Sequence, residues 1–272
     1  MEKIVCITSM GLDYYNTIGK IMVESYKRVW PKEIPLYVYS EDRLDIIDEN
    51  IHTIDIHKAC DPQLQNYLDY IGDHFSRNFS YKVYSWIHAI RNIEADWILW
   101  LDADTVCFAK PDEQFFNTVF NKEFQTVYMG TVMYKDKKGW KGKTNCDSAI
   151  ISFNKNTAEA TNFVNEFERL YESHDINNRE LFPKPNDTHA FIHCIEHVSV
   201  PSYNLNSKLD SLSPLKETML HDYFRHFKAS KKDKNLIGAL MDKMIKSADK
   251  LEGSKLAKRI ERVERRYRAS HG

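Results

Sequence analysis

Trp-Ile-Leu-Trp-Leu-Asp-Ala-Asp-Thr-Val, residues 97–106, is the stretch that decides the fold. Its five consecutive large apolar residues are typical of a strand buried on both faces, as in a parallel sheet between layers of helices. Asp102 and Asp104 follow where this strand is expected to end. Because open α/β sheets bind ligands at the carboxyl ends of their strands, the two aspartates are candidate binding residues.

The spacing of these two aspartates indicates a metal site. Two neighbouring carboxylates repel each other and are costly to bury unpaired. A divalent cation bound through oxygen is their natural partner. The alternative is a strand that ends in two solvated turn aspartates, since Asp-x-Asp alone is a common pattern. The buried run before the pair favours the metal site.

Composition is compatible with one large α/β domain carrying an appendage, or with two small domains. The chain has 272 residues, of which 42% are hydrophobic and 12% aromatic, enough for a packed core. Its five cysteines are scattered and include no CxxC pair, so neither a disulfide framework nor a zinc ribbon is expected. We see no secretion signal and no segment of membrane-spanning length, and we expect a cytoplasmic protein.

Charge is distributed unevenly along the chain. From Arg225 onward there are 15 Lys and Arg against 6 Asp and Glu, whereas the first 224 residues hold 23 basic and 33 acidic residues. A basic tail on an acidic body predicts a polyanion or an anionic surface as a partner, which allows for peripheral attachment to a membrane. A helix that packs back on the acidic body is the alternative.

The hydrophobic pattern predicts an α/β fold. Strands are expected at 3–9, 36–40, 51–56 and 96–102, alternating with helices at 15–29, 44–49 and 80–92. This order predicts right-handed βαβ units and a mainly parallel sheet. Further strands at 126–134, 148–153 and 198–203 and a helix at 156–172 follow. We expect one catalytic domain over residues 1–232 and a basic helical tail over residues 233–272.

Four further motifs accompany Leu-Asp-Ala-Asp. Lys82 lies on the helix before the apolar strand, and Cys-Asp-Ser-Ala-Ile at 146–150 enters a later strand. Asp-Thr-His-Ala-Phe at 187–191 begins a helix, and His-Phe-Lys-Ala-Ser-Lys-Lys occupies 226–232. In this order the motifs resemble those of metal-dependent glycosyltransferases of the A-type fold, such as glycogenin and bacterial galactosyltransferases. The resemblance reaches residue 232, although only the Asp-x-Asp segment is close.

The resemblance implies a single Rossmann-like glycosyltransferase domain that binds a nucleotide sugar, expected to be a UDP-sugar, with Mn²⁺ or Mg²⁺. Asp104 and His226 would coordinate the ion, and Asp102 would bind it through water or reach the ribose. The remaining donor-binding residues that it implies are Ala103 between the two aspartates, Lys82 and Lys232 at the diphosphate, and Thr8 and Tyr14 at the base. The metal would act as a Lewis acid on the leaving diphosphate.

Two further aspartates are candidate catalytic residues. Asp147 or Asp187 would serve as the general base that an inverting reaction needs. The late order of His226 and Lys232 instead resembles that of retaining enzymes. Each aspartate also has a purely structural interpretation, Asp147 as a turn residue and Asp187 as a helix N-cap.

Other residues also have structural alternatives. His226 lies in a lysine-rich segment typical of a surface, and Lys82 has the character of an exposed helix residue. His189, His193 and His197 recur every four residues, which is ligand-like spacing on one helix face. We interpret these three histidines as a partly buried polar face and predict no zinc site there, because HExxH is absent.

Two other functions fit part of the sequence. Asp-Ala-Asp-Thr-Val at 102–106 also matches the start of haloacid dehalogenase-like phosphatases, although their motif follows the first strand rather than the fourth. The other alternative is a non-catalytic module that binds nucleotide sugars. The acceptor is open: the basic tail suits either a lipid-linked or other glycan on an anionic membrane, or a hydroxymethylated base in DNA, as modified by viral glycosyltransferases.

Overall fold

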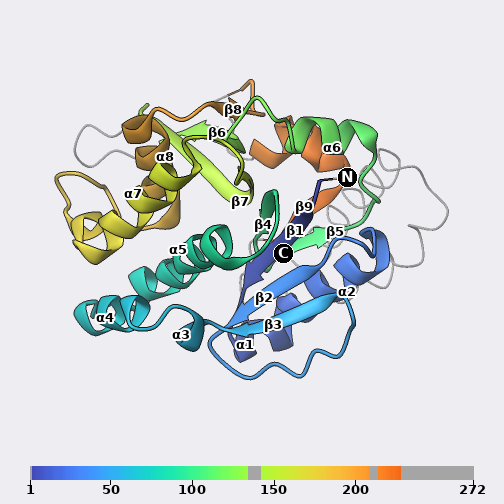
Figure 1. Ribbon diagram of the computed structural model, residues 1–272, viewed down its shortest axis with the longest axis horizontal. Helices are drawn as coiled ribbons and strands as arrows, with labels where there is room; N and C mark the ends of the chain where they lie inside the picture. The colour runs from blue at the N-terminus through green and yellow to red at the C-terminus, as the bar shows by residue number, and fades with distance from the viewer. Residues whose placement is uncertain (1, 134–141, 209–213, 228–272) are drawn as a thin grey trace, which may run out of the picture.

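The structure is a computed structural model that describes residues 2–133, 142–208 and 214–227. The tail predicted at 233–272, together with Lys232, lies outside the described residues. Within the described part, helices follow most strands of the first half of the chain, although no helix separates the second strand from the third (Figure 1). The first-half elements are β1 (Ile4–Ser9), α1 (Leu12–Tyr14), a π-helical turn (Tyr15–Gly19), α2 (Lys20–Val29), β2 (Leu36–Ser40), β3 (Ile51–Asp55), α3 (Ile56–Ala59), α4 (Gln63–Tyr70), α5 (His74–Asn92) and β4 (Trp97–Leu101).

The second half adds an antiparallel part to the sheet. Its elements are β5 (Thr105–Cys107), α6 (Glu113–Val119), β6 (Thr126–Val132), β7 (Thr144–Asn154), α7 (Ala160–Glu172), α8 (Asp187–Val198), β8 (Ser202–Asn204) and β9 (Phe224–His226), with short 3₁₀ turns between some of them. The described residues form a seven-stranded sheet in the order β3-β2-β1-β4-β7-β6-β8. Pairs β3-β2, β2-β1, β1-β4 and β6-β8 are parallel, and β4-β7 and β6-β7 are antiparallel. The predicted α/β fold with a mainly parallel sheet is confirmed.

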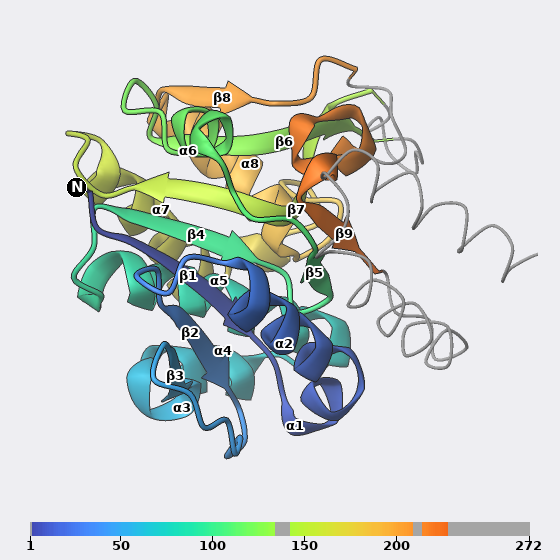
Figure 2. The same ribbon diagram turned by 90° about the vertical axis from the view of Figure 1, so that its right-hand side faces the viewer.

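Strand β4 lies between two layers of helices, as its continuous apolar run predicts. Ile98 and Trp100 pack into a core with α5, α7 and α8, whereas Leu99 and Leu101 pack into a second core with α2 and α6. This alternation follows from the two-residue period of a strand. Figure 2 shows α2 and α6 on the near side of the sheet and α5 and α7 behind it.

Trp86 on α5 is the centre of the core on the α5 side. Its ring contacts those of Trp100, Phe153, Phe167 and Phe191 at centroid distances between 5.5 and 6.2 Å. Trp86 is fully buried. Because buried aromatic residues contribute large apolar area, this cluster joins three helices to the two central strands.

A second, two-stranded sheet brings the end of the described chain back to the end of β4. Strand β9 pairs with β5 in antiparallel register, with Thr105 opposite His226. The backbone N–H of Phe227 donates to the carbonyl of Asp104 at 2.9 Å and extends this pairing. The sequence did not predict this short sheet.

Some predicted elements differ in the structure. The helix expected at 44–49 is absent, because Leu44 reaches the core while Ile47 is exposed, and Asp48 accepts a hydrogen bond from the Asn50 N–H instead. The helix expected to begin at residue 80 begins at 74, where Asp73 caps it by accepting from the Ser76 N–H. Within the described part of the chain, every helix is too short or too polar to cross a bilayer.

Candidate active site

Asp102 and Asp104 lie in the turn directly after β4, as predicted. The Thr105 N–H donates to the Asp102 carbonyl at 2.8 Å and closes this turn. The Asp102 N–H donates to the carbonyl of Ala149 on β7, also at 2.8 Å, so the turn is attached to the neighbouring strand. The Asp104 side chain is largely buried. The solvated-turn alternative is therefore wrong for Asp104.

His226 lies beside both aspartates because β9 pairs with β5. Its Nε2 atom is 3.1 Å from Oδ1 of Asp104 and 3.7 Å from Oδ2 of Asp102. One ligand atom from each of these three residues lies within 4.8 Å of the other two. The side chain of His226 is 12% exposed, so the alternative that it is a surface residue of a lysine-rich segment is wrong.

The pKa of His226 reflects this environment. Burial alone would lower the pKa of the imidazole, but the hydrogen bond and charge of Asp104, together with the charges of Asp102 and Asp147, raise it to about 9. The ring is therefore protonated at neutral pH when no metal is bound. A bound cation would replace that proton as the positive partner of the carboxylates.

Asp147 lies on the other side of the His226 ring. Strand β7 is antiparallel to β4, so the beginning of β7 lies at the carboxyl end of β4. The Asp147 Oδ1 atom is 3.9 Å from His226 Nδ1 and accepts a hydrogen bond from the Ala149 N–H at 3.1 Å. The structure thus brings Asp147 to the Asp-x-Asp site.

Lys82 is buried beneath Asp102. Its Nζ atom lies 2.6 Å from Asp102 Oδ1 and 2.9 Å from Asp187 Oδ2. The same atom contacts the hydroxyl and the carbonyl of Ser148, each at 2.9 Å. Burial would lower the pKa of Lys82, but Asp102 and Asp187 raise it above its usual range. The interpretation of Lys82 as an exposed helix residue is wrong.

Asp187 is fully buried in the first turn of α8. The N-cap is Asn186, whose side chain accepts from the His189 N–H, so the N-cap interpretation of Asp187 is wrong. Asp187 accepts from the Ser148 hydroxyl and pairs with Lys82. Its other oxygen has no hydrogen-bond partner among the described residues.

The predicted base-binding residues lie at different depths. Thr8 is completely buried, and its hydroxyl has no partner within the described part of the chain. Tyr14 has a partly exposed ring, and its hydroxyl is close enough to Asp104 for that carboxylate to affect its pKa. Burial first, and then the charge and hydrogen bond of Asp104, raise the pKa of Tyr14 above its usual range. Ala103 is buried between the two aspartates.

Sequence reasoning missed two residues of the hydrogen-bond network around Asp102 and Lys82. The indole N–H of Trp100 donates to Asp102 Oδ1 at 2.7 Å, and Ser148 contacts Lys82. Trp100 precedes Asp102 by two residues, and side chains two residues apart along a strand point to the same face. The contact between Trp100 and Asp102 was therefore predictable from the sequence. Ser148 lies within the motif at 146–150, but nothing in the sequence indicated its partner.

Comparison with solved structures gives the fold a name. The structure is similar to that of the galactosyltransferase LgtC in complex with donor and acceptor sugar analogues, with a TM-score of 0.53 and 11% identity over 91% of this chain and 96% of that one. It is also similar to the bifunctional glycosyltransferase WbbM, with a TM-score of 0.51 and 12% identity over 95% of this chain and 52% of that one. This chain has the A-type glycosyltransferase fold. The sequence matches no family model and no curated protein.

This A-type fold also weighs against the phosphatase alternative. The Asp-x-Asp pair follows β4, the fourth strand along the chain, whereas the phosphatase motif follows the first. At 11–12% identity the likeness shows the fold alone, so the reaction must be argued from the site.

Proposed function

We propose that this protein is a metal-dependent glycosyltransferase that moves a sugar from a nucleoside diphosphate sugar, a UDP-sugar by preference, to a hydroxyl acceptor. The observation that carries the proposal is the convergence of Asp102, Asp104 and His226 at the carboxyl edge of the sheet, with ligand atoms within 4.8 Å of one another. In open α/β sheets, this edge is where ligands bind.

The residues present fit a divalent cation. Two carboxylates and one imidazole suit Mn²⁺ or Mg²⁺ better than a thiolate-preferring ion, and the imidazole favours Mn²⁺. The bound ion would neutralise the charge that develops on the leaving diphosphate. The raised pKa of His226 indicates that Asp104, Asp102 and Asp147 create a negative potential at the position proposed for the metal.

Four side chains around the ligands have proposed roles. Lys82 holds Asp102 in place, and Asp187 holds Lys82, through contacts of 2.6 and 2.9 Å. A role of Lys82 at the diphosphate would require its ammonium to give up one of these partners. Asp147 is the better placed of the two base candidates, because its side chain is 13% exposed whereas that of Asp187 is 0% exposed. Tyr14 binds the base with its ring, and its hydroxyl lies on the side of Asp104.

The test is hydrolysis and transfer with a panel of nucleotide sugars in the presence of Mn²⁺. Activity that needs the metal and disappears in Asp104→Asn supports the proposal. Tight binding of a nucleotide sugar without turnover, even with an acceptor panel, would favour the non-catalytic module. Phosphate release from monoesters without sugar transfer would favour the phosphatase alternative.

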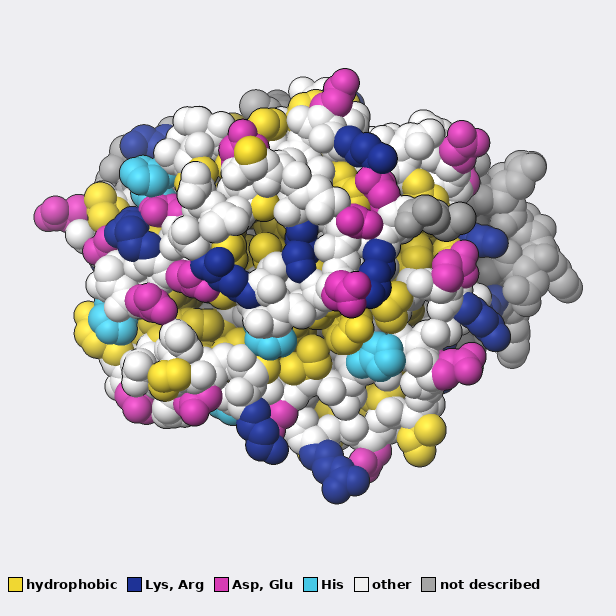
Figure 3. All heavy atoms as spheres, viewed as in Figure 1, with side chains coloured by type: hydrophobic (Ala, Val, Ile, Leu, Met, Phe, Trp, Pro, Cys, Tyr) yellow, Lys and Arg dark blue, Asp and Glu magenta, His cyan; other side chains and the backbone are white. Residues whose placement is uncertain are grey.

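The basic tail supports a second proposal about the acceptor. On the face viewed in Figure 3, basic and acidic side chains of the described residues are intermixed. The charge asymmetry between tail and body is taken from the sequence, because the tail lies outside the described residues. We propose that the tail recruits a polyanionic acceptor, either a saccharide on an anionic membrane or a modified base in DNA. Binding to phosphatidylserine liposomes compared with duplex DNA separates these. Deleting residues 254–272 should raise the acceptor KM and leave donor hydrolysis unchanged.

A further inference from the structure

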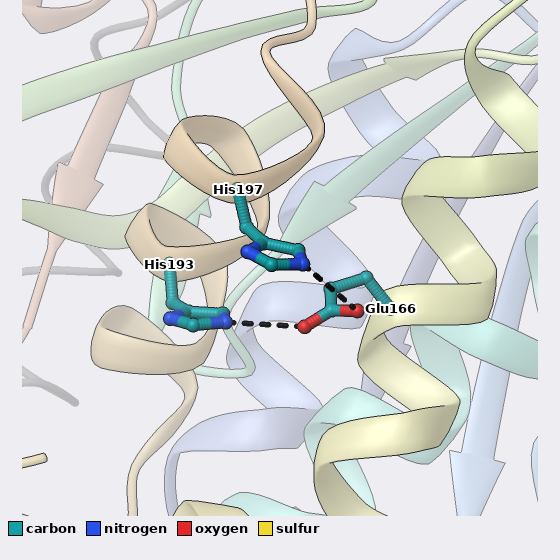
Figure 4. A group of neighbouring side chains, drawn as sticks. All are labelled: Glu166, His193 and His197. Carbon is teal, nitrogen blue, oxygen red and sulfur yellow. Dashed lines mark hydrogen bonds and ion pairs between the residues drawn. The ribbon is translucent and has the colours of Figure 1, made fainter. Parts of the chain in front are cut away.

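Two of the three histidines predicted to share one face of a helix lie beside a carboxylate from another helix. His193 and His197 are four residues apart on α8, and Glu166 projects toward them from α7 (Figure 4). His189 does not join them, because its Nδ1 atom lies 3.0 Å from the carbonyl of Lys184. The cluster therefore consists of Glu166, His193 and His197.

The three side chains present their ligand atoms to one another. His193 Nε2 is 3.1 Å from Glu166 Oε1, and His197 Nε2 is 4.0 Å from Glu166 Oε2. The two imidazole rings are nearly parallel, with centroids 5.3 Å apart and 12° between their planes. Such stacking follows from an i, i+4 spacing on a helix. One ligand atom from each residue lies within 4.8 Å of the other two.

Glu166 is prepared as an anionic ligand. Arg169 donates to both oxygens, from Nε at 3.0 Å and from its terminal nitrogen at 2.8 Å. The arginine also pairs with Asp175, which offsets its charge near a cation. Such an outer partner fixes the orientation of a ligating group.

We propose that Glu166, His193 and His197 form a second metal site, which binds a transition-metal ion of the Zn²⁺ class and clamps α7 to α8. Two imidazoles and one carboxylate are a ligand set that Zn²⁺ uses, whereas Mg²⁺ prefers oxygen ligands. The His197 side chain is 60% exposed, so solvent can supply the remaining ligand. The expectation that these histidines are only a polar face did not include Glu166, which is distant in sequence.

This second site is separate from the Asp102, Asp104 and His226 cluster and does not depend on the proposed glycosyltransferase activity. The two sites differ in ligand chemistry, because the first has two carboxylates and one imidazole and the second has the reverse. We therefore expect Mn²⁺ to prefer the first cluster and Zn²⁺ the second.

The test measures Zn²⁺ binding to the full chain by equilibrium dialysis and metal analysis, in an Asp104→Asn, His226→Gln background that removes the first cluster. We expect one bound Zn²⁺. Adding His197→Gln or His193→Gln should lower the Zn²⁺ affinity by roughly 10–100-fold or more. Loss of a residue that only orients a metal ligand already costs about this much, and these substitutions remove a ligand itself. His52→Gln, a substitution of an exposed histidine on β3, is the matched control and should leave binding unchanged.

Two readouts accompany the binding assay. Zn²⁺ should raise the Tm of the background protein in proportion to the logarithm of its concentration, and His197→Gln should abolish this shift. Bound Co²⁺ should show the visible absorption of a low-coordinate site with nitrogen ligands. His197→Gln changes an exposed side chain, so the variant is expected to fold, as circular dichroism will check.

Two results would overturn the proposal. One is a folded His197→Gln protein that binds Zn²⁺ as its background does, and the other is a background protein that binds no Zn²⁺.

Discussion

The imidazole Nε2 of His226 lies 3.1 Å from a carboxylate oxygen of Asp104, although the two residues are far apart in the sequence. The contact depends on a pairing of only three residues, β5 with β9, in which His226 stands opposite Thr105. A short strand that follows the turn of the Asp-x-Asp motif therefore fixes where the late histidine lies. The metal-binding hypothesis depends on this pairing as much as on the aspartates.

Replacing Asp104 by Asn should reduce the rate of metal-dependent donor hydrolysis by about 100-fold or more, while the protein remains folded. The substitution keeps the size of the side chain but removes the charge that attracts both the metal and the His226 proton. Mn²⁺ affinity from calorimetry and initial rates of hydrolysis are the measurements. The control is Asp45→Asn, since the Asp45 side chain is 86% exposed. Wild-type rates in Asp104→Asn would remove Asp104 from the site.

Mn²⁺ affinity should depend on pH through His226. The metal-free imidazole has a pKa of about 9, so a proton must leave before the nitrogen can bind a metal. Affinity should therefore rise by about tenfold per pH unit between pH 7 and 8.5. His226→Gln should bind Mn²⁺ more weakly and with a flatter pH profile. An equal slope in the two proteins would show that another group titrates.

The same titration predicts how the stability of the metal-free protein changes with pH. The folded-state pKa of about 9 lies above the unfolded value of about 6.5, so protonation of His226 stabilises the folded state. This stabilisation is fully present below about pH 6.5 and is lost as the pH rises through 9. Chemical denaturation of wild type and His226→Gln between pH 6 and 9.5 measures it, and their difference in unfolding free energy should shrink with rising pH. A constant difference would contradict the assignment.

Substitutions of Tyr14 can separate two proposed roles, stacking of its ring on the base and support of Asp104 by its hydroxyl. Its hydroxyl is close enough to Asp104 for that carboxylate to raise its pKa, and its ring is partly exposed. Tyr14→Phe keeps a ring for stacking but removes the hydroxyl, so Mn²⁺ affinity should fall by roughly tenfold while binding of the metal-free nucleotide is unchanged. Tyr14→Ala should weaken both. If Phe matches wild type in both assays, the hydroxyl contact with Asp104 has no role in the site.

The sequence predicted the parts of the site that depend on local pattern. The continuous apolar run of β4 indicated a strand buried on both faces, and the position of Asp102 and Asp104 after it followed directly. Chain order alone suggested His226. Its contact with Asp104 was not predictable from pattern, because a three-residue strand such as β9 has too few residues to show a period.

Lys82 shows why a single polar residue is hard to assign from sequence. Charged side chains are rarely fully buried, which favoured an exposed position. Yet Lys82 precedes Trp86 by four residues, and Trp86 is on the buried face of α5, so the helical period already placed both on one face. Its two carboxylate partners come from elements that only the tertiary fold brings together.

Replacing Lys82 by Met should be the most destabilising of these substitutions. Methionine has a similar length, but it leaves the carboxylates of Asp102 and Asp187 facing each other without the ammonium that lies 2.6 and 2.9 Å from them. Removing one partner of a buried ion pair costs roughly 3–5 kcal/mol, because the remaining charge is uncompensated. The measurement is the free energy of unfolding from urea denaturation at pH 7.5.

The Lys82→Met, Asp187→Asn double variant tests the cause of this loss. Neutralising Asp187 removes one of the two uncompensated charges, so the double variant should be more stable than Lys82→Met alone. Metal affinity should stay low in both, since Asp102 has lost the residue that positions it. The matched control is Lys58→Met, a change at an exposed lysine on α3 whose side chain is 86% exposed. Equal stability of Lys82→Met and wild type would mean that the buried ion pair does not support the site.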